Sequence, residues 1–194
     1  MLHDGFWQKD LVPLSNKIIY WQRRINRLFD NGYGYTDKNV AHARHELTRA
    51  LFFSACIVRK IIEEEFEAVD AIRLHNKIFT DEEIKVEKEH YMLHNQQIQI
   101  YCLPLKDESI NCFDDYCHED YDYHSVKKEL HSIKHISNWL IHSYVWELGC
   151  LKENNKHIDG FIISSDYDKT KASYFVELTS WNKIINLCVQ NAYL

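Results

Sequence analysis

The chain has 194 residues, of which 45% are hydrophobic and 27% charged, and this composition excludes a disordered or fibrous protein and favours one globular domain, residues 1–194. The formal net charge of −6 excludes a protein that binds duplex nucleic acid over its whole surface, although it permits a local basic cleft. The six cysteines form no Cys-x-x-Cys pair, the N-terminal residues are polar and mixed, and no apolar run is long enough for a membrane span, so we expect a cytoplasmic protein with free thiols and no membrane association.

The first predicted helix covers residues 16–29. It follows an irregular lead-in in which Pro13 is a break and Ser15 a helix cap. Apolar residues recur at helical spacing, and the glycines of the turn at 30–37 end the helix. Its polar side is basic and carries Arg23, Arg24 and Arg27, with Tyr20 and Trp21 nearby. This patch is a candidate contact for phosphates or an acidic partner, although a solvated helix face is the simpler explanation.

A second, longer helix is predicted over residues 38–72. Thr36 or Asp37 can cap its first turn, and apolar residues repeat along it at helical spacing. The opposite side carries a polar stripe in which His45 and Arg49 lie one turn apart. We therefore expect this helix to have one face in the core and one face that presents histidine and arginine.

The periodicity changes after residue 76. Alternating apolar and polar residues predict strands near 84–86 and at 97–105, which makes 84–105 a β-rich region. Residues 107–123 contain seven acids and no lysine or arginine. This composition predicts an exposed, acidic, tyrosine-rich loop.

The stretch from 124 to 147 is predicted to be one amphipathic helix that ends at Gly149. Its apolar residues gather on one face at 100° per residue. The opposite face is lined by His124, His131, His135, Asn138 and His142. Imidazoles one turn apart can bind a metal ion or transfer protons near neutral pH, and the simplest alternative is a solvated face that happens to be rich in histidine.

The last part of the chain predicts a β-hairpin and a final helix. Residues 160–166 and 172–178 are rich in β-branched and aromatic residues and are separated by a short turn. Ser180 can cap a short apolar helix that follows. The predicted fold is therefore α+β and mainly α, with two long antiparallel helices, shorter helices and a small antiparallel β-hairpin region. Its helical core is 16–72 and 124–149, and 158–178 is β-rich.

Two other groups of residues carry the side-chain types that bind metal ions. Thiols and imidazoles follow one another in the acidic segment, at Cys112, Cys117, His118 and His124. Their Cys-x4-Cys-His spacing lacks the two-residue knuckle of zinc sites, and the carboxylates around them do not follow the EF-hand spacing. We therefore predict no metal and no cofactor.

The segment from Asn138 to Trp146 resembles the motif helix of HEPN domains, which are helical, usually dimeric domains that include many metal-independent ribonucleases. His142 matches the histidine of the family motif, and Asn138 lies near its polar position. Ser137 stands where the family has arginine. The resemblance implies that Arg49 or Arg44 of the other long helix supplies the positive charge, while the histidine moves the proton of the RNA 2′-hydroxyl.

The leading functional prediction is a cytosolic HEPN-like module that binds or cleaves RNA in a prokaryotic stress or antiviral system, and the same resemblance implies a homodimer. Its catalytic residues are expected to be His142, Asn138, His135 and Arg49. Its contacts to nucleic acid or a partner are expected from His131, His45, Arg23, Arg24 and Arg27. The alternative is a non-enzymatic interaction protein whose acidic segment 107–123 binds a basic partner.

Overall fold

The computed structural model describes residues 6–75, 93, 96–107, 120–143, 145–151, 157–164 and 171–190. Within these ranges the helices are α1 (Phe6–Asp30), α2 (Lys38–His75), η2 (a 3-10 turn, Tyr123–Ser125), α5 (Ile133–His142) and α6 (Leu178–Gln190). The strands are β1 (Gln97–Pro104), β2 (Lys127–Ser132), β3 (Val145–Gly149), β4 (Gly160–Ser164) and β5 (Ala172–Glu177). The predicted α+β, mainly helical class is confirmed, but the sheet is larger than the predicted hairpin region.

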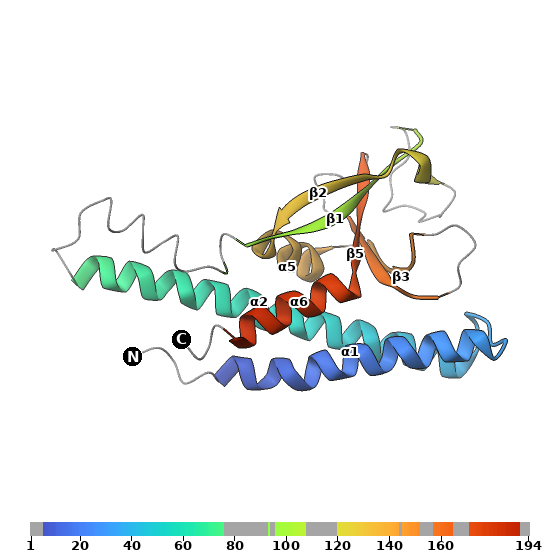
Figure 1. The fold of residues 1–194 in the computed structure, drawn as a ribbon, viewed down its shortest axis with the longest axis horizontal. Helices are drawn as coiled ribbons and strands as arrows, with labels where there is room; N and C mark the ends of the chain where they lie inside the picture. The colour runs from blue at the N-terminus through green and yellow to red at the C-terminus, as the bar shows by residue number, and fades with distance from the viewer. Residues whose placement is uncertain are drawn as a thin grey trace.

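The five strands form one antiparallel sheet in the order β2-β1-β5-β4-β3 (Figure 1). The predicted strand at 97–105 is confirmed as β1, and the predicted hairpin is confirmed as β4 paired with β5. The pairing of β4 with β5 requires Gly160, because a Cβ there would lie 2.3 Å from the Phe175 ring and 2.4 Å from the Val176 carbonyl oxygen. The strand predicted near 84–86 lies outside the described residues.

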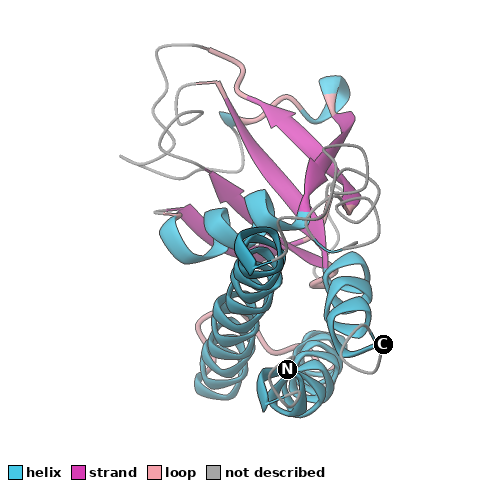
Figure 2. Ribbon diagram, turned by 90° about the vertical axis from the view of Figure 1, so that its left-hand side faces the viewer, coloured by secondary structure: helices cyan, strands magenta, loops and turns pink. Residues whose placement is uncertain are grey.

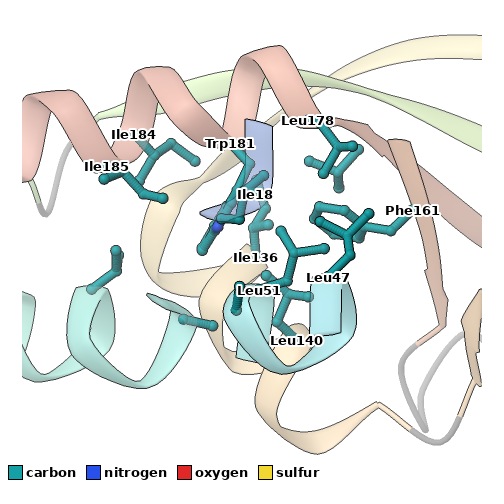
Figure 3. Packing of buried hydrophobic residues seen from close by; sticks show 14 of the residues in the cluster. Ile18, Leu47, Leu51, Ile136, Leu140, Phe161, Leu178, Trp181, Ile184 and Ile185 are labelled. Carbon is teal, nitrogen blue, oxygen red and sulfur yellow. The ribbon is translucent and has the colours of Figure 1, made fainter. Parts of the chain in front are cut away.

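The α-helices lie on one side of the sheet, and the main hydrophobic core fills the space between them (Figure 2). Figure 3 shows side chains from α1, α2, α5, β4 and α6 meeting in this core, with Trp181 at its centre. Trp181 is fully buried, and its Nε1–H donates to Ser54 Oγ at 2.8 Å. The Ser54 hydroxyl in turn donates to the Leu51 carbonyl, so the one polar atom of this large side chain is satisfied inside the core.

α1 and α2 form the antiparallel long pair at the base of the molecule (Figure 1). Gly32, with φ of 84°, closes the end of α1, and Asp37 Oδ1 accepts from the Asn39 N–H at the start of α2, as predicted. α1 is longer than predicted because it continues through Pro13. Its first turns are held by tertiary contacts, including the Trp7 Nε1–H bond to Glu64 at 2.8 Å. No helix in the described ranges is both long enough and apolar enough to cross a membrane.

The prediction of one helix from 124 to 147 is wrong. The only α-helix described in this stretch is Ile133–His142, with the 3-10 turn η2 and strand β2 before it and strand β3 after it. Residues 127–132 pair with β1 along its length, and Leu130, which the helical pattern places in the core, is 65% exposed. Because this pairing joins segments about thirty residues apart, it overrides a local periodicity that fits a helix as well. The long antiparallel partner of α2 is therefore α1 and not a helix over residues 124–147.

The far face of the sheet carries a smaller apolar cluster formed by Leu103, Tyr121, Ile162 and Phe175. Tyr121 is 1% exposed, and its hydroxyl forms a 2.7 Å hydrogen bond with Ser173 Oγ. The prediction that 107–123 is an exposed loop is therefore wrong at its C-terminal end. Residues 108–119 of that segment lie outside the described residues.

Candidate active site at Arg59 and His142

His142 is fixed at the end of α5 by hydrogen bonds of the residue that follows it. The Ser143 N–H donates to the Trp139 carbonyl and ends the helix. The Ser143 hydroxyl donates to the Ser164 carbonyl at 2.7 Å and accepts from the Ser164 N–H at 3.1 Å. This pair of bonds ties the end of α5 to β4, so the exposed His142 side chain projects from a rigid corner.

Arg59 of α2 lies opposite this corner. Its Nε–H donates to Glu63 Oε1 at 2.8 Å, which is an i,i+4 ion pair, and its Nη1–H donates to His142 Nε2 at 3.0 Å. Arginine can only donate, so the His142 ring accepts at Nε2 and carries its proton on Nδ1. The structure thus forms a carboxylate–guanidinium–imidazole chain at the surface between α2 and α5.

The position of the arginine corrects the prediction. Arg59 lies beside His142, whereas Arg49 pairs with Glu46 at 3.0 Å and Arg44 pairs with Glu147 at 3.1 Å. Sequence reasoning missed Arg59. The available signal was its i,i+4 spacing to Glu63, which favours an oriented guanidinium on a helix surface.

Two side chains on α2 and α5 have hydrogen-bonding atoms without a partner in the described residues. Arg59 has five N–H donors, and its contacts within the described residues use one at Nε and one at Nη1. Asn138, one turn before His142 on α5, has a buried Oδ1 with no hydrogen-bond partner in the described part of the chain. A buried acceptor left unpaired costs on the order of 1–3 kcal/mol. Arg59 therefore keeps N–H donors for a polar ligand, whereas the unpaired oxygen of Asn138 is covered by protein and is not accessible to one.

A groove of about 300 Å³ lies beside His142, between α2, α5 and β3. Its lining is mostly apolar and consists of Thr48, Arg49, Phe52, Phe53, Leu140, Ile141, Ser143 and Trp146. Phe52 and Phe53 are 40% and 49% exposed, and their rings meet edge to face at 6.0 Å. Ile141 and Ser143, which line the groove, are the chain neighbours of His142, but neither His142 nor Arg59 is part of its lining.

His131 and His135 belong to a different group of rings. His131 lies on β2, and its ring contacts those of Trp139 and Tyr174 at 5.0 and 5.3 Å. His135 on α5 contacts Trp139 at 4.6 Å and His131 at 5.8 Å, and Glu129 pairs with His131 at 3.0 Å. These histidines pack where β2 meets α5. The predicted line of histidines along one helix therefore does not exist, although His135, Asn138 and His142 share α5.

The remaining predicted residues lie elsewhere. His45 is exposed on α2, fourteen residues before Arg59 and so about 21 Å away along the helix axis. Arg23, Arg24 and Arg27 lie on α1. Cys112, Cys117 and His118 fall outside the described residues, and in the described ranges no three histidine, cysteine or acidic side chains gather as metal ligands.

Cys56 lies one turn before Arg59 on α2. Partial burial raises the pKa of its thiol, and the positive charge of Arg59 opposes that rise. Cys188 in the core shows the extreme case, because burial raises the pKa of its thiol to about 12. Neither thiol is therefore activated as a nucleophile at neutral pH.

Comparison with known proteins finds no matching family model, no matching curated protein and no matching solved structure.

Proposed function

We propose that this protein is a HEPN-like RNA-processing module that binds RNA and cleaves it without a metal ion, with Arg59 and His142 as the reacting pair. The observation that carries the proposal is the 3.0 Å contact between Arg59 Nη1 and His142 Nε2, made across 83 residues of sequence at an exposed site. A guanidinium beside a neutral imidazole combines a phosphate ligand with a proton acceptor. The proposal keeps the predicted role of His142 and assigns the role expected of Arg49 or Arg44 to Arg59.

The cleavage step follows from these two groups. A bound phosphate draws the Arg59 guanidinium toward its oxygens, and the lone pair on His142 Nε2 is then free. The imidazole accepts the proton of the 2′-hydroxyl as that oxygen attacks the adjacent phosphorus. The bond from phosphorus to the 5′-oxygen breaks, the leaving oxygen takes a proton from water, and the hydroxide so formed takes up the proton that His142 holds, so the imidazole is neutral again and the product ends in a cyclic 2′,3′-phosphate. Arg59 stabilises the charge that develops on the phosphate oxygens.

The surroundings of the pair support RNA as the substrate class. The groove with Phe52, Phe53 and Trp146 gives an unpaired base an aromatic surface that extends to Ile141 and Ser143, the chain neighbours of His142. The Glu63 carboxylate holds the guanidinium of Arg59 in orientation.

The test is cleavage of labelled single-stranded RNA by the wild-type chain and by His142→Ala, in the presence of a metal chelator. Losing a general base reduces a rate by about 10²- to 10⁴-fold, so we expect His142→Ala to lose detectable cleavage. His124→Ala is the matched control, because His124 is also exposed and lies on η2 away from α5. It should cleave at the wild-type rate.

Cleavage by His142→Ala at the wild-type rate would contradict the assignment of this residue. Wild-type protein that leaves RNAs of varied sequence intact, with or without chelator, would contradict the nuclease function itself. A product that ends in a linear 3′-phosphate from the first turnover onward would contradict attack by the 2′-hydroxyl.

A further inference from the structure

The arginine face of α1, defined as Arg23, Arg24 and Arg27, is exposed, and none of its members forms an ion pair within the described residues. An exposed guanidinium without an acidic neighbour keeps its full charge and all of its donors for a ligand. This is unexpected in a chain that has 29 acidic residues against 23 basic ones.

The charge of α1 is opposite to that of the chain as a whole. α1 contains five lysine and arginine residues and two aspartates, which gives a formal charge of +3 against −6 for the whole chain. One of these aspartates, Asp30, is paired with His157 at 2.7 Å and not with an arginine of the face. The field of α1 is therefore locally positive on an acidic protein, and it attracts anions to this helix.

The arginine face also borders a hollow. A shallow, solvent-open hollow of about 420 Å³ on this side of α1 is lined by Asn16, Ile19, Tyr20 and the three arginines. Tyr20 is 56% exposed, and its ring is held edge to face against Trp21 at 4.9 Å. A fixed and exposed aromatic ring beside unpaired arginines is the combination on which single-stranded nucleic acids stack their bases.

The spacing of the charges fits an extended strand. With a helical rise of 1.5 Å per residue, Arg23 and Arg27 lie about 6 Å apart along the axis on the same side, with Tyr20 about one turn before Arg23. Successive guanidiniums along a helix can thus contact successive phosphates of one strand. A duplex would need a broader basic surface than one helix face provides.

We propose that the arginine face of α1 binds single-stranded RNA, with its arginines on the phosphates and Tyr20 stacked on a base. The choice of RNA over another polyanion rests on the proposed function, but the surface is separate from Arg59 and His142. It holds the strand and takes no part in cleavage. Binding and cleavage can therefore fail independently.

The test measures binding of a 2′-O-methyl RNA oligonucleotide of about ten nucleotides by fluorescence anisotropy at several salt concentrations. The methyl group blocks attack by the 2′-oxygen, so binding is measured without cleavage. The triple-glutamine variant carries R23Q, R24Q and R27Q. The matched control carries K38Q, K127Q and K183Q, which remove the same total charge from three exposed lysines on other elements.

We expect the triple-glutamine variant to bind at least about tenfold more weakly and to lose about 2 from the slope of log affinity against log salt, since each phosphate contact on a single strand contributes about 0.7. The lysine control should bind as the wild type does. Tyr20→Ala should weaken binding by about tenfold with little change in the salt slope. Circular dichroism should show all variants folded, because the substituted side chains are exposed.

The proposal is overturned if the triple-glutamine variant binds RNA as tightly as wild type, or if the lysine control loses as much affinity. It is also overturned if the wild type binds polyglutamate in preference to the RNA, because the arginine face then serves an acidic protein. Loss of cleavage in His142→Ala has no bearing on these results, and cleavage by the wild type does not depend on them.

Discussion

The arginines of α2 and those of α1 are used in opposite ways. On α2, Arg44, Arg49 and Arg59 each form an ion pair with a carboxylate, at 3.1, 3.0 and 2.8 Å. On α1, the arginine face has no acidic partner in the part of the chain that the structure describes. Sequence alone shows two basic helix faces of similar composition, and only the tertiary contacts separate them.

The difference indicates what each set can do. A paired guanidinium is held in one orientation, which is what a reacting site needs, and Arg59 keeps three N–H donors beyond those bonded to Glu63 and His142. Unpaired guanidiniums can follow a flexible polyanion, and their strength is the sum of several contacts. We therefore assign position-sensitive chemistry to α2 and charge-dependent binding to α1, and conservative substitutions separate the two.

Replacement of arginine by lysine should give the largest contrast. Arg59→Lys keeps the charge but removes the fork that reaches Glu63 and His142 together, so cleavage should fall by about 10- to 100-fold. The same change at Arg23, Arg24 and Arg27 together should alter RNA affinity by less than about threefold, because a point charge suffices on a phosphate. Single-turnover cleavage and anisotropy measure the two quantities. If lysine substitution reduced cleavage and RNA affinity by the same factor, the proposed difference between the arginines of α2 and those of α1 would be contradicted.

Removing an arginine from α2 should also destabilise the protein more than removing one from α1, but this effect is smaller. Arg44 lies over the Tyr35 ring at 5.0 Å and pairs with Glu147, with about a quarter of its side chain exposed. Arg44→Met should therefore lower the free energy of unfolding by about 1 kcal/mol. Arg24→Met should change it by less than about 0.5 kcal/mol. Urea unfolding gives both numbers, and an equal loss for the two variants would show that the arginines of α1 also stabilise the fold.

The smallest effect should appear at Cys56. The charge of Arg59 holds the pKa of this thiol below the value that burial alone would give, so Arg59→Met should raise the pKa further. The thiolate fraction at a given alkaline pH then falls, and alkylation of Cys56 becomes slower by a few-fold. Mass spectrometry of the peptide that contains Cys56 measures this rate across pH. Arg24→Met should leave the profile unchanged, and an unshifted profile for Arg59→Met would contradict the placement of the guanidinium.

The sequence predicted those elements whose determinants are local. The Asp37 cap, the turn at Gly32 and the β4–β5 pair each depend on residues that lie close together in the chain. The stretch 124–147 was mispredicted because its apolar spacing fits a helix. Residues 127–132 instead form a strand that pairs with β1, which lies about thirty residues earlier in the chain.

The candidate site was predictable only in part. His142 and Asn138 were identified from their spacing within one segment. The partner of His142, Arg59, comes from α2, and the spacing of residues on α5 carries no information about how α2 packs against α5. Arg44 and Arg49 were the arginines of α2 that the sequence led us to expect beside His142, but they pair with Glu147 and Glu46 instead. The registry between α2 and α5 is set by core packing of side chains such as Leu51 and Ile136, and it brings position 59 to His142.

Single-turnover cleavage of RNA over a range of protein concentrations tests the division between the two surfaces most directly, because it separates the rate at saturation from the affinity. We predict that His142→Ala loses the rate at saturation by at least about 100-fold while its RNA affinity stays within about threefold of wild type. The triple-glutamine variant should show the reverse, with weakened affinity and a rate at saturation close to that of wild type. If both variants change the same parameter, or if His142→Ala retains the wild-type rate, the account is contradicted.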